Sequence, residues 1–178
     1  MNIFLETHKL SKQGETTINY DPETNAPEEL VKLMREVNTN SYADGFFQFI
    51  TPKSFSTYLS LWNLNSIDCI PFIKFPFGQL AFYHQEKYKL LNPVYNSIDI
   101  IGDKGDLDFT MNYLLCDRIA LENSLFIDIY EQAFKNIGSI KYNEMYSFVP
   151  SVRLGGNRHA ENVVKAQMRI EMTILSRI

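Results

Sequence analysis

The densest group of residues that could do chemistry lies near the C-terminal end, in the stretch Arg153-Leu-Gly-Gly-Asn-Arg-His159. A glycine pair permits a sharp turn with φ > 0, and a helix that begins directly after it presents unpaired backbone N–H groups to an anion. With Arg153 and Arg158 beside them, Gly155 and Gly156 could cradle a phosphate or a carboxylate. The stretch matches neither a Walker A loop nor a dinucleotide fingerprint. The simpler interpretation is a structural turn in which Arg153 pairs with a nearby acid.

A second group consists of four aspartates within ten residues, opposed there by Lys104 alone: Asp99, Asp103, Asp106 and Asp108. Their spacing differs from that of an EF-hand, which needs a D-x-D-x-D-G run and a closing glutamate. One interpretation is a solvated loop in which Asp106 caps a helix. The other is an acidic patch for a basic protein partner such as a nuclease domain, because complementary charge speeds association.

The remaining reactive side chains form no recognisable centre. The three histidines, His8, His84 and His159, have no second ligand at metal-binding spacing. No G-x-S-x-G nucleophile elbow occurs. Cys69 and Cys116 stand in apolar surroundings and are expected to be buried free thiols. The sequence therefore predicts a protein that is not an enzyme and needs neither a metal nor another cofactor.

The length and charge of the chain further limit the classes of protein to which it can belong. A chain of 178 residues is enough for one domain or two small lobes. The net charge of −4 argues against direct binding of nucleic acid, which needs a basic face, but suits a basic protein partner. Neither a secretory signal nor an apolar run of membrane-spanning length is visible, so we expect a cytoplasmic protein.

The first half of the chain alternates helix and strand signals. Residues 1–26 are polar and suggest a short arm or strand. Pro27 suits the start of a helix, and Thr51-Pro52 starts another, with a strand over 46–50 between them. The first helix would bury Leu30, Leu33, Met34 and Val37. The aromatic residues of this region are core residues or partner anchors: Tyr42, Phe46, Phe47, Phe49, Phe55 and Tyr58.

From residue 67 to residue 101, short β-rich runs separated by turn signals predict an antiparallel meander, with Pro71 and Pro76 confining their segment to an edge or a bulge. Residues 102–105 are expected to form a flexible charged hinge. Two helices with a joint near Asp117 should follow over 107–137 and end at Gly138.

The last segment is predicted to be a helix that begins after Asn157 and continues to the end of the chain. Its apolar stripe consists of Val164, Met168, Met172 and Leu175, widened by Val163, Ile170 and Ile174. The expected fold class is α+β: an antiparallel meander flanked by helices, with a mainly helical C-terminal lobe packed on it. We place the lobe boundary near residue 104, which gives lobes 1–104 and 105–178.

The C-terminal part also carries a family resemblance. The motif Met145-Tyr146-x-Phe148-Val149-Pro150, followed by Leu154-Gly155-Gly156, Glu161-Asn162 and an apolar end, resembles the C-terminal signature of the GAD-like immunity proteins of type VI secretion. Upstream, Ser41-Tyr42-Ala43-Asp44-Gly45-Phe46-Phe47 and Thr51-Pro52 resemble the GAD-like domain of these proteins. The resemblance covers residues from about Pro27 to the C-terminus.

The resemblance implies an immunity protein that binds a cognate type VI effector toxin, a DNase, and blocks it by stoichiometric contact. Such a role needs no cofactor, and from the charge and the lack of a long apolar run we expect neither a membrane nor a nucleic acid as a partner. Its oligomeric state is left open. Two alternatives remain: a general protein-binding module without a toxin partner, and a nucleotide- or anion-binding protein that uses the turn from Arg153 to His159.

Overall fold

The computed structural model of the protein describes residues 6–12, 26–65 and 67–178. Within these ranges, seven strands form one antiparallel sheet in chain order, and two more strands form a separate antiparallel pair. The strands of the large sheet are β1 (Leu10–Lys12), β2 (Ser41–Tyr42), β3 (Phe47–Phe49), β4 (Ile70–Lys74), β5 (Leu80–His84), β6 (Lys87–Asn92) and β7 (Ser97–Asp103). The pair consists of β8 (Glu144–Phe148) and β9 (Val163–Gln167).

The helices are α2 (Glu28–Val37), α3 (Pro52–Leu59), α4 (Leu107–Cys116), α5 (Ile127–Ile137) and α6 (Met168–Leu175). Short 3-10 turns lie at Ala43–Gly45, Ser60–Trp62, Val152–Leu154 and Ala160–Asn162, and a π turn at Ala120–Ser124 joins α4 to α5. The predicted α+β class is confirmed, as are the two helices after residue 106 and the end of the second at Gly138, which has φ +74°.

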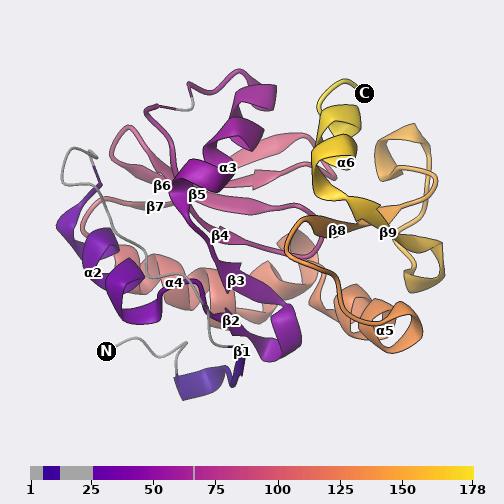
Figure 1. Cartoon of the computed structure of the whole chain (residues 1–178), viewed down its shortest axis with the longest axis horizontal. Coiled ribbons are helices and arrows are strands. Elements are labelled where there is room, and N and C mark those ends of the chain that lie inside the picture. Colours follow the sequence, from indigo (N-terminus) through magenta and orange to yellow (C-terminus); the bar gives the residue numbers. More distant parts are fainter. Residues whose placement is uncertain (1–5, 13–25, 66) are drawn as a thin grey trace.

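Helices cover both faces of the large sheet (Figure 1). α2, α4 and α5 lie on one face and contribute to the larger core cluster, which includes Leu30 and Met111. α3 and α6 lie on the opposite face, over a smaller cluster that includes Met172. Successive side chains of a strand point to opposite faces, and accordingly Leu90 belongs to the larger cluster and Leu91 to the smaller.

The two helices and the strand predicted between residues 27 and 62 are present, whereas most of the arm or strand expected over residues 1–26 lies outside the described residues. The buried residues of α2 are Leu30, Leu33, Met34 and Val37, as predicted. α3 begins at Pro52 and buries Phe55 and Leu59. The aromatic residues of this region are mainly core, since Tyr42, Phe46, Phe47, Phe49 and Phe55 are all buried and Tyr58 is half-buried.

The meander is also confirmed, with one refinement. Gly78 has φ +84° in the turn before β5, and Gln85 and Glu86 have positive φ in the turn after it. Pro71 lies in a strand with neighbours on both sides, and the register shifts between Pro71 and Ile73. Of the two predicted settings for this proline, the bulge is therefore the correct one, because a bulge accommodates a residue without an N–H donor.

The C-terminal part differs from the prediction: it mixes helices with a two-stranded sheet and is not mainly helical. The last helix begins at Met168 and not after Asn157, because residues 163–167 pair with β8 instead. Val163 lies opposite Phe148 and is buried with it. A 3-10 turn at Val152–Leu154 leads from β8 into the glycine pair.

The shorter helix has a narrower buried face than predicted. Met168, Met172 and Leu175 are buried, at spacings of four and three. Val164, Ile170 and Ile174 are exposed and do not belong to the core. The predicted apolar stripe therefore combined residues of a strand and of a helix, which have different periods.

The expected hinge at 102–105 is wrong in its first half, because Gly102 and Asp103 are strand residues of β7. A Cβ at Gly102 would lie 1.9 Å from Oγ1 of Thr110, so glycine allows α4 to pack closely on β7. Both core clusters contain residues from either side of residue 104. The lobe boundary at that residue stays a prediction.

The buried face of α6 can be tested by two aspartates in the same helix. Met172 is 0% exposed, whereas Ile170 is 62% exposed. Met172→Asp places an unpaired charge in the core and should lower the free energy of unfolding by several kcal/mol, roughly 3–5. Ile170→Asp, the matched control, should change it by less than about 1 kcal/mol. Chemical denaturation of both variants measures the difference, and equal midpoints would show that α6 is not docked by this face.

Candidate partner-binding surface

The predicted acidic residues lie around the connection from β7 to α4. Asp99 and Asp103 belong to β7, Asp106 directly precedes α4, and Asp108 lies in its first turn. All four are exposed. The side chain of Asp106 makes no capping bond, although its carbonyl accepts a hydrogen bond from the N–H of Thr110 at 2.9 Å. α4 thus begins where predicted, without the predicted side-chain cap.

The sheet does not bring all four aspartates to one face. Asp99 lies opposite Leu90 on β6, and Asp103 lies opposite Lys87, with which it forms an ion pair. Positions 87 and 90 point to opposite faces, and so do their partners. The cause is the register shift between Tyr88 and Lys89, which inserts an extra residue into β7. The acidic corner, as we call Asp103, Asp106 and Asp108, is therefore distinct from Asp99.

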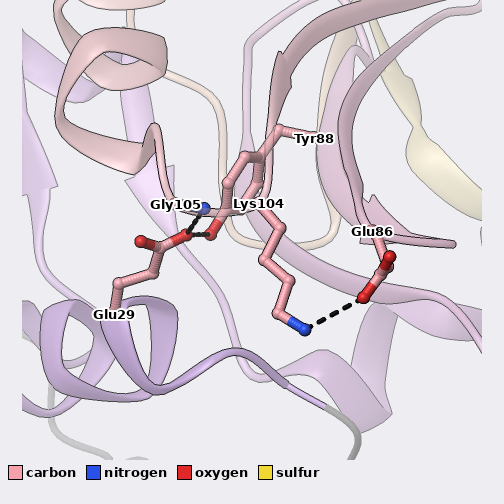
Figure 2. Close-up of polar contacts among 5 residues, drawn as sticks. All are labelled: Glu29, Glu86, Tyr88, Lys104 and Gly105. Atoms are coloured by element: carbon pink, nitrogen blue, oxygen red, sulfur yellow. Dashed lines mark hydrogen bonds and ion pairs between the residues drawn. The ribbon is translucent and has the colours of Figure 1, made fainter.

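Polar contacts hold the turn at Lys104 and Gly105, between Asp103 and Asp106, to the rest of the fold (Figure 2). One carboxylate oxygen of Glu29, on α2, accepts hydrogen bonds from the Tyr88 hydroxyl at 2.6 Å and from the Gly105 N–H at 2.8 Å. The Lys104 ammonium pairs with Glu86 at 3.0 Å. The turn between the aspartates is thus tied both to α2 and to the turn before β6.

Exposed apolar residues lie beside these acids, and the sequence reasoning did not single them out. Ile100 on β7 is 65% exposed, and Phe109 on α4 is 69% exposed. Ile100 lies opposite Lys89, and hence on the same sheet face as Asp103. Apolar side chains bordered by charges are typical of protein–protein interfaces. Helical periodicity could have revealed that Phe109 is exposed. It lies between Asp108 and Thr110, and because Thr110 is on the buried face of α4, Phe109 points away from the core.

The turn after β8 has a structural role. Gly155 has φ +87°, which confirms the predicted turn, and Gly156 approaches the backbone of Pro150 so closely that a Cβ would lie 1.9 Å from its carbonyl oxygen. Arg153 donates from Nη1 to the Leu175 carbonyl at 2.9 Å, at the C-terminal end of α6. A cation there stabilises the last carbonyls of a helix.

The second arginine of the turn also has protein partners. The guanidinium of Arg158 lies 5.6 Å from the ring centres of both Tyr95 and Phe126. No helix begins at Asn157, so the backbone donors expected for an anion there are not arranged as a helix N-terminus. An anion at Arg153, Gly155, Gly156 and Arg158 would have to compete with these contacts, and that site stays a prediction.

The histidines and cysteines are dispersed. His8 lies 2.6 Å from the Leu115 carbonyl oxygen, His84 lies 3.3 Å from the Lys89 ammonium, and His159 is exposed. Over residues 6–12, 26–65 and 67–178, no three His, Cys, Asp or Glu side chains come close enough to hold a metal ion. Both cysteines are free, and burial raises the pKa of Cys69 to about 11, which disfavours the reactive thiolate.

A cleft that the sequence did not predict surrounds Lys74, at the end of β4. Its volume is about 600 Å³, and its walls come from the β1–β3 end of the sheet, α5 and residues 139–142. Lys74 is only 7% exposed, and its ammonium donates to the Tyr142 carbonyl at 2.5 Å. It also lies 4.8 Å from the centre of the Tyr142 ring. Desolvation lowers the pKa of Lys74 to about 8, against the opposing influence of Glu144.

The close approach at Gly156 leads to a prediction on stability. Gly156→Ala should lower the free energy of unfolding by roughly 1–3 kcal/mol, because its methyl group would overlap the Pro150 carbonyl. Gly155→Asn is the matched control, since nothing lies within 4 Å of a Cβ there and asparagine tolerates φ > 0. It should cost less than about 1 kcal/mol. Thermal melting compares the two, and a larger loss from Gly155→Asn would contradict the geometry.

The buried ammonium predicts a dependence of stability on pH. The pKa of Lys74 is about 8 in the folded protein and 10.5 as the unperturbed value, so between these values the unfolded chain binds more protons. Stability should therefore rise with pH in this window relative to Lys74→Met, by at most about 1.4 kcal/mol per pH unit. Urea unfolding of both proteins at pH 7.5 and 9.5 measures the change. A difference between the two proteins that stays constant with pH would contradict it.

Comparisons with known proteins support the C-terminal part of the resemblance noted in the sequence. The chain matches the crystal structure of Atu4351 from Agrobacterium tumefaciens with a TM-score of 0.76 at 17% identity, over 97% of this chain and 86% of that one. At this identity the likeness establishes the fold alone. None of the curated proteins matches the chain. No helix in the described part of the chain is long and apolar enough to cross a membrane.

The family model described as "T6SS immunity protein Tdi1, C-terminal" matches residues 112–178. This stretch contains α5, β8, β9, α6 and the glycine turn, and so includes the motif on which the resemblance rests. Immunity proteins act by neutralising an effector and are not enzymes, in agreement with the prediction. The C-terminal part of this chain, residues 112–178, is thus similar to the C-terminal domain of the type VI secretion immunity protein Tdi1.

Proposed function

We propose that the protein protects the cell that makes it by binding a cognate type VI effector stoichiometrically and blocking its active surface. The observation that carries this proposal is the family match over residues 112–178. The dispersed histidines and cysteines support an inhibitor that works by contact and not by chemistry. On this proposal the protein acts in the cytoplasm, where an incoming effector would meet its target.

We further propose that the effector cleaves DNA and that the N-terminal part of this chain is the GAD-like domain found with such immunity proteins. An enzyme that cleaves DNA needs a basic groove to hold the phosphate backbone. This chain has a net charge of −4, which suits such a groove and disfavours direct contact with DNA. The acidic corner, with Ile100 and Phe109 nearby, supplies the charged and apolar contacts that an interface of this kind uses.

The proposed function is tested by asking whether this protein protects bacterial cells from the effector. The effector encoded beside this gene would be expressed in a bacterial host with this protein, with an unrelated immunity protein, or alone. Survival only with this protein, together with co-purification of the two in equal amounts, is the expected result. Cell death despite stable expression of both proteins, without a complex, would refute the proposal. Chromosomal DNA is followed in parallel, because intact DNA in cells killed by the effector would refute the DNase part alone.

The acidic corner is expected to raise the association rate. Asp103→Asn, Asp106→Asn and Asp108→Asn together should lower the association rate constant about three- to tenfold at low salt, and less at high salt where charges are screened. The dissociation rate should change less. Stopped-flow mixing or biosensor kinetics with the purified effector, at two salt concentrations, measures both rates.

The control removes the same charge elsewhere. Asp128→Asn, Glu131→Gln and Glu161→Gln are substitutions at exposed positions on α5 and in the turn before β9. If both triple variants slow association equally, only the net charge matters. If the first variant remains folded and associates at the normal rate at low salt, the acidic corner lies outside the interface.

A further inference from the structure

A row of polar side chains crosses one end of the large sheet. Lys12 on β1 lies opposite Ser41 on β2, Ser41 opposite Gln48 on β3, and Gln48 opposite Lys74 on β4. Directly paired residues of neighbouring strands point to the same face. At a strand spacing of about 4.8 Å, the row spans about 14 Å from Lys12 to Lys74.

This row lies in the cleft of about 600 Å³ around Lys74. The segment after α5 forms the facing wall and adds a third lysine, Lys141, beside Tyr142. Among the described residues that line the cleft, Asp44 is the one acid. Glu144 lies near this wall, and its carboxylate accepts a hydrogen bond from the Lys141 N–H at 2.8 Å. The cleft therefore gathers positive charge in a chain whose net charge is −4.

The environment of Lys74 favours a negatively charged ligand. Its ammonium has three donor hydrogens, and the Tyr142 carbonyl is the one acceptor that the described residues provide within hydrogen-bond distance. The rings of Tyr142 and Phe55 lie 4.8 and 5.9 Å from it and exclude water from part of its surface. A buried cation without a full set of acceptors is costly, and a carboxylate would supply a charge-assisted hydrogen bond at that position.

We propose that this cleft binds an acidic peptide segment of a protein partner, with one carboxylate on Lys74 and others on Lys141 and Lys12. The elongated row suits an extended segment whose side chains repeat along it. Between the terminal lysines, Ser41 and Gln48 can donate and accept hydrogen bonds, as a peptide backbone requires. The negative net charge of the whole chain opposes the alternative of a nucleic acid. The cleft is separate from the acidic corner, and this proposal does not depend on the effector.

The test uses a fluorescent, acetylated tetraglutamate peptide and its tetraglutamine counterpart in binding anisotropy at low salt. The wild-type protein should bind the glutamate peptide and not the glutamine peptide. Lys74→Met should weaken binding at least tenfold, and Lys141→Gln severalfold. Lys74→Arg, which retains the charge, should restore part of the affinity. Lys32→Gln, which removes an exposed lysine on α2, should leave binding unchanged.

Thermal melting of every variant shows whether it is folded, and the comparison of Lys74→Arg with Lys74→Met separates charge from shape. Equal affinity of the wild type, Lys74→Met and Lys32→Gln for the glutamate peptide would overturn the proposal, as would absence of binding to the wild type. Displacement of the peptide by equimolar inorganic phosphate would overturn the peptide assignment in favour of a simple anion site. None of these results would bear on protection against the effector.

Discussion

The rest of the structure depends on one constraint: the central strands of the large sheet are apolar on both faces. In β6, Leu90 and Leu91 point in opposite directions, and both are buried. A sheet of this kind is stable only if each face is covered, because exposed apolar area costs about 25 cal/mol per Å². α2, α4 and α5 cover one face, while α3 and α6 cover the other.

The C-terminal segment is the part that completes this cover. Met145 and Met172 both pack against the turn before β5, where a Cβ at Gly78 would lie 2.6 Å from Cε of Met145 and 3.0 Å from Sδ of Met172. The backbone N–H of Tyr146 donates to the Pro76 carbonyl at 2.7 Å, which fixes β8 to the same turn. The stretch that carries the immunity-family signature is therefore also a structural requirement for the sheet that precedes it.

Because the core uses the apolar residues on both faces, the surface features lie at the ends of the sheet. The acidic corner and its exposed apolar neighbours lie at the β7 end of the sheet, whereas the cleft around Lys74 lies at the β1–β4 end. The two regions have opposite charge and lie at opposite ends of the seven-stranded sheet. On the two proposals above, each region would bind a partner of the opposite charge.

The sequence by itself determined the local elements. Proline and acidic residues at the start of α2, the i, i+3, i+4 spacing of its core residues, and the alternation of β runs and turns in the meander all act within a few residues of one another. The motif around Met145 and Gly155 was enough to point to the family. The exposed positions of Asp103, Asp106 and Asp108 followed from composition alone.

Only the tertiary structure decided which residues meet across the sheet. Val163 and its neighbours are compatible with a helix, but in the structure they pair with β8 as a strand. The helix therefore begins only at Met168. A register shift of one residue separated Asp99 from Asp103, and cross-strand pairing aligned Lys74 with residues far away in the chain. The physical reason is that strand pairing joins groups distant in sequence, whose register depends on the whole core and not on local propensity.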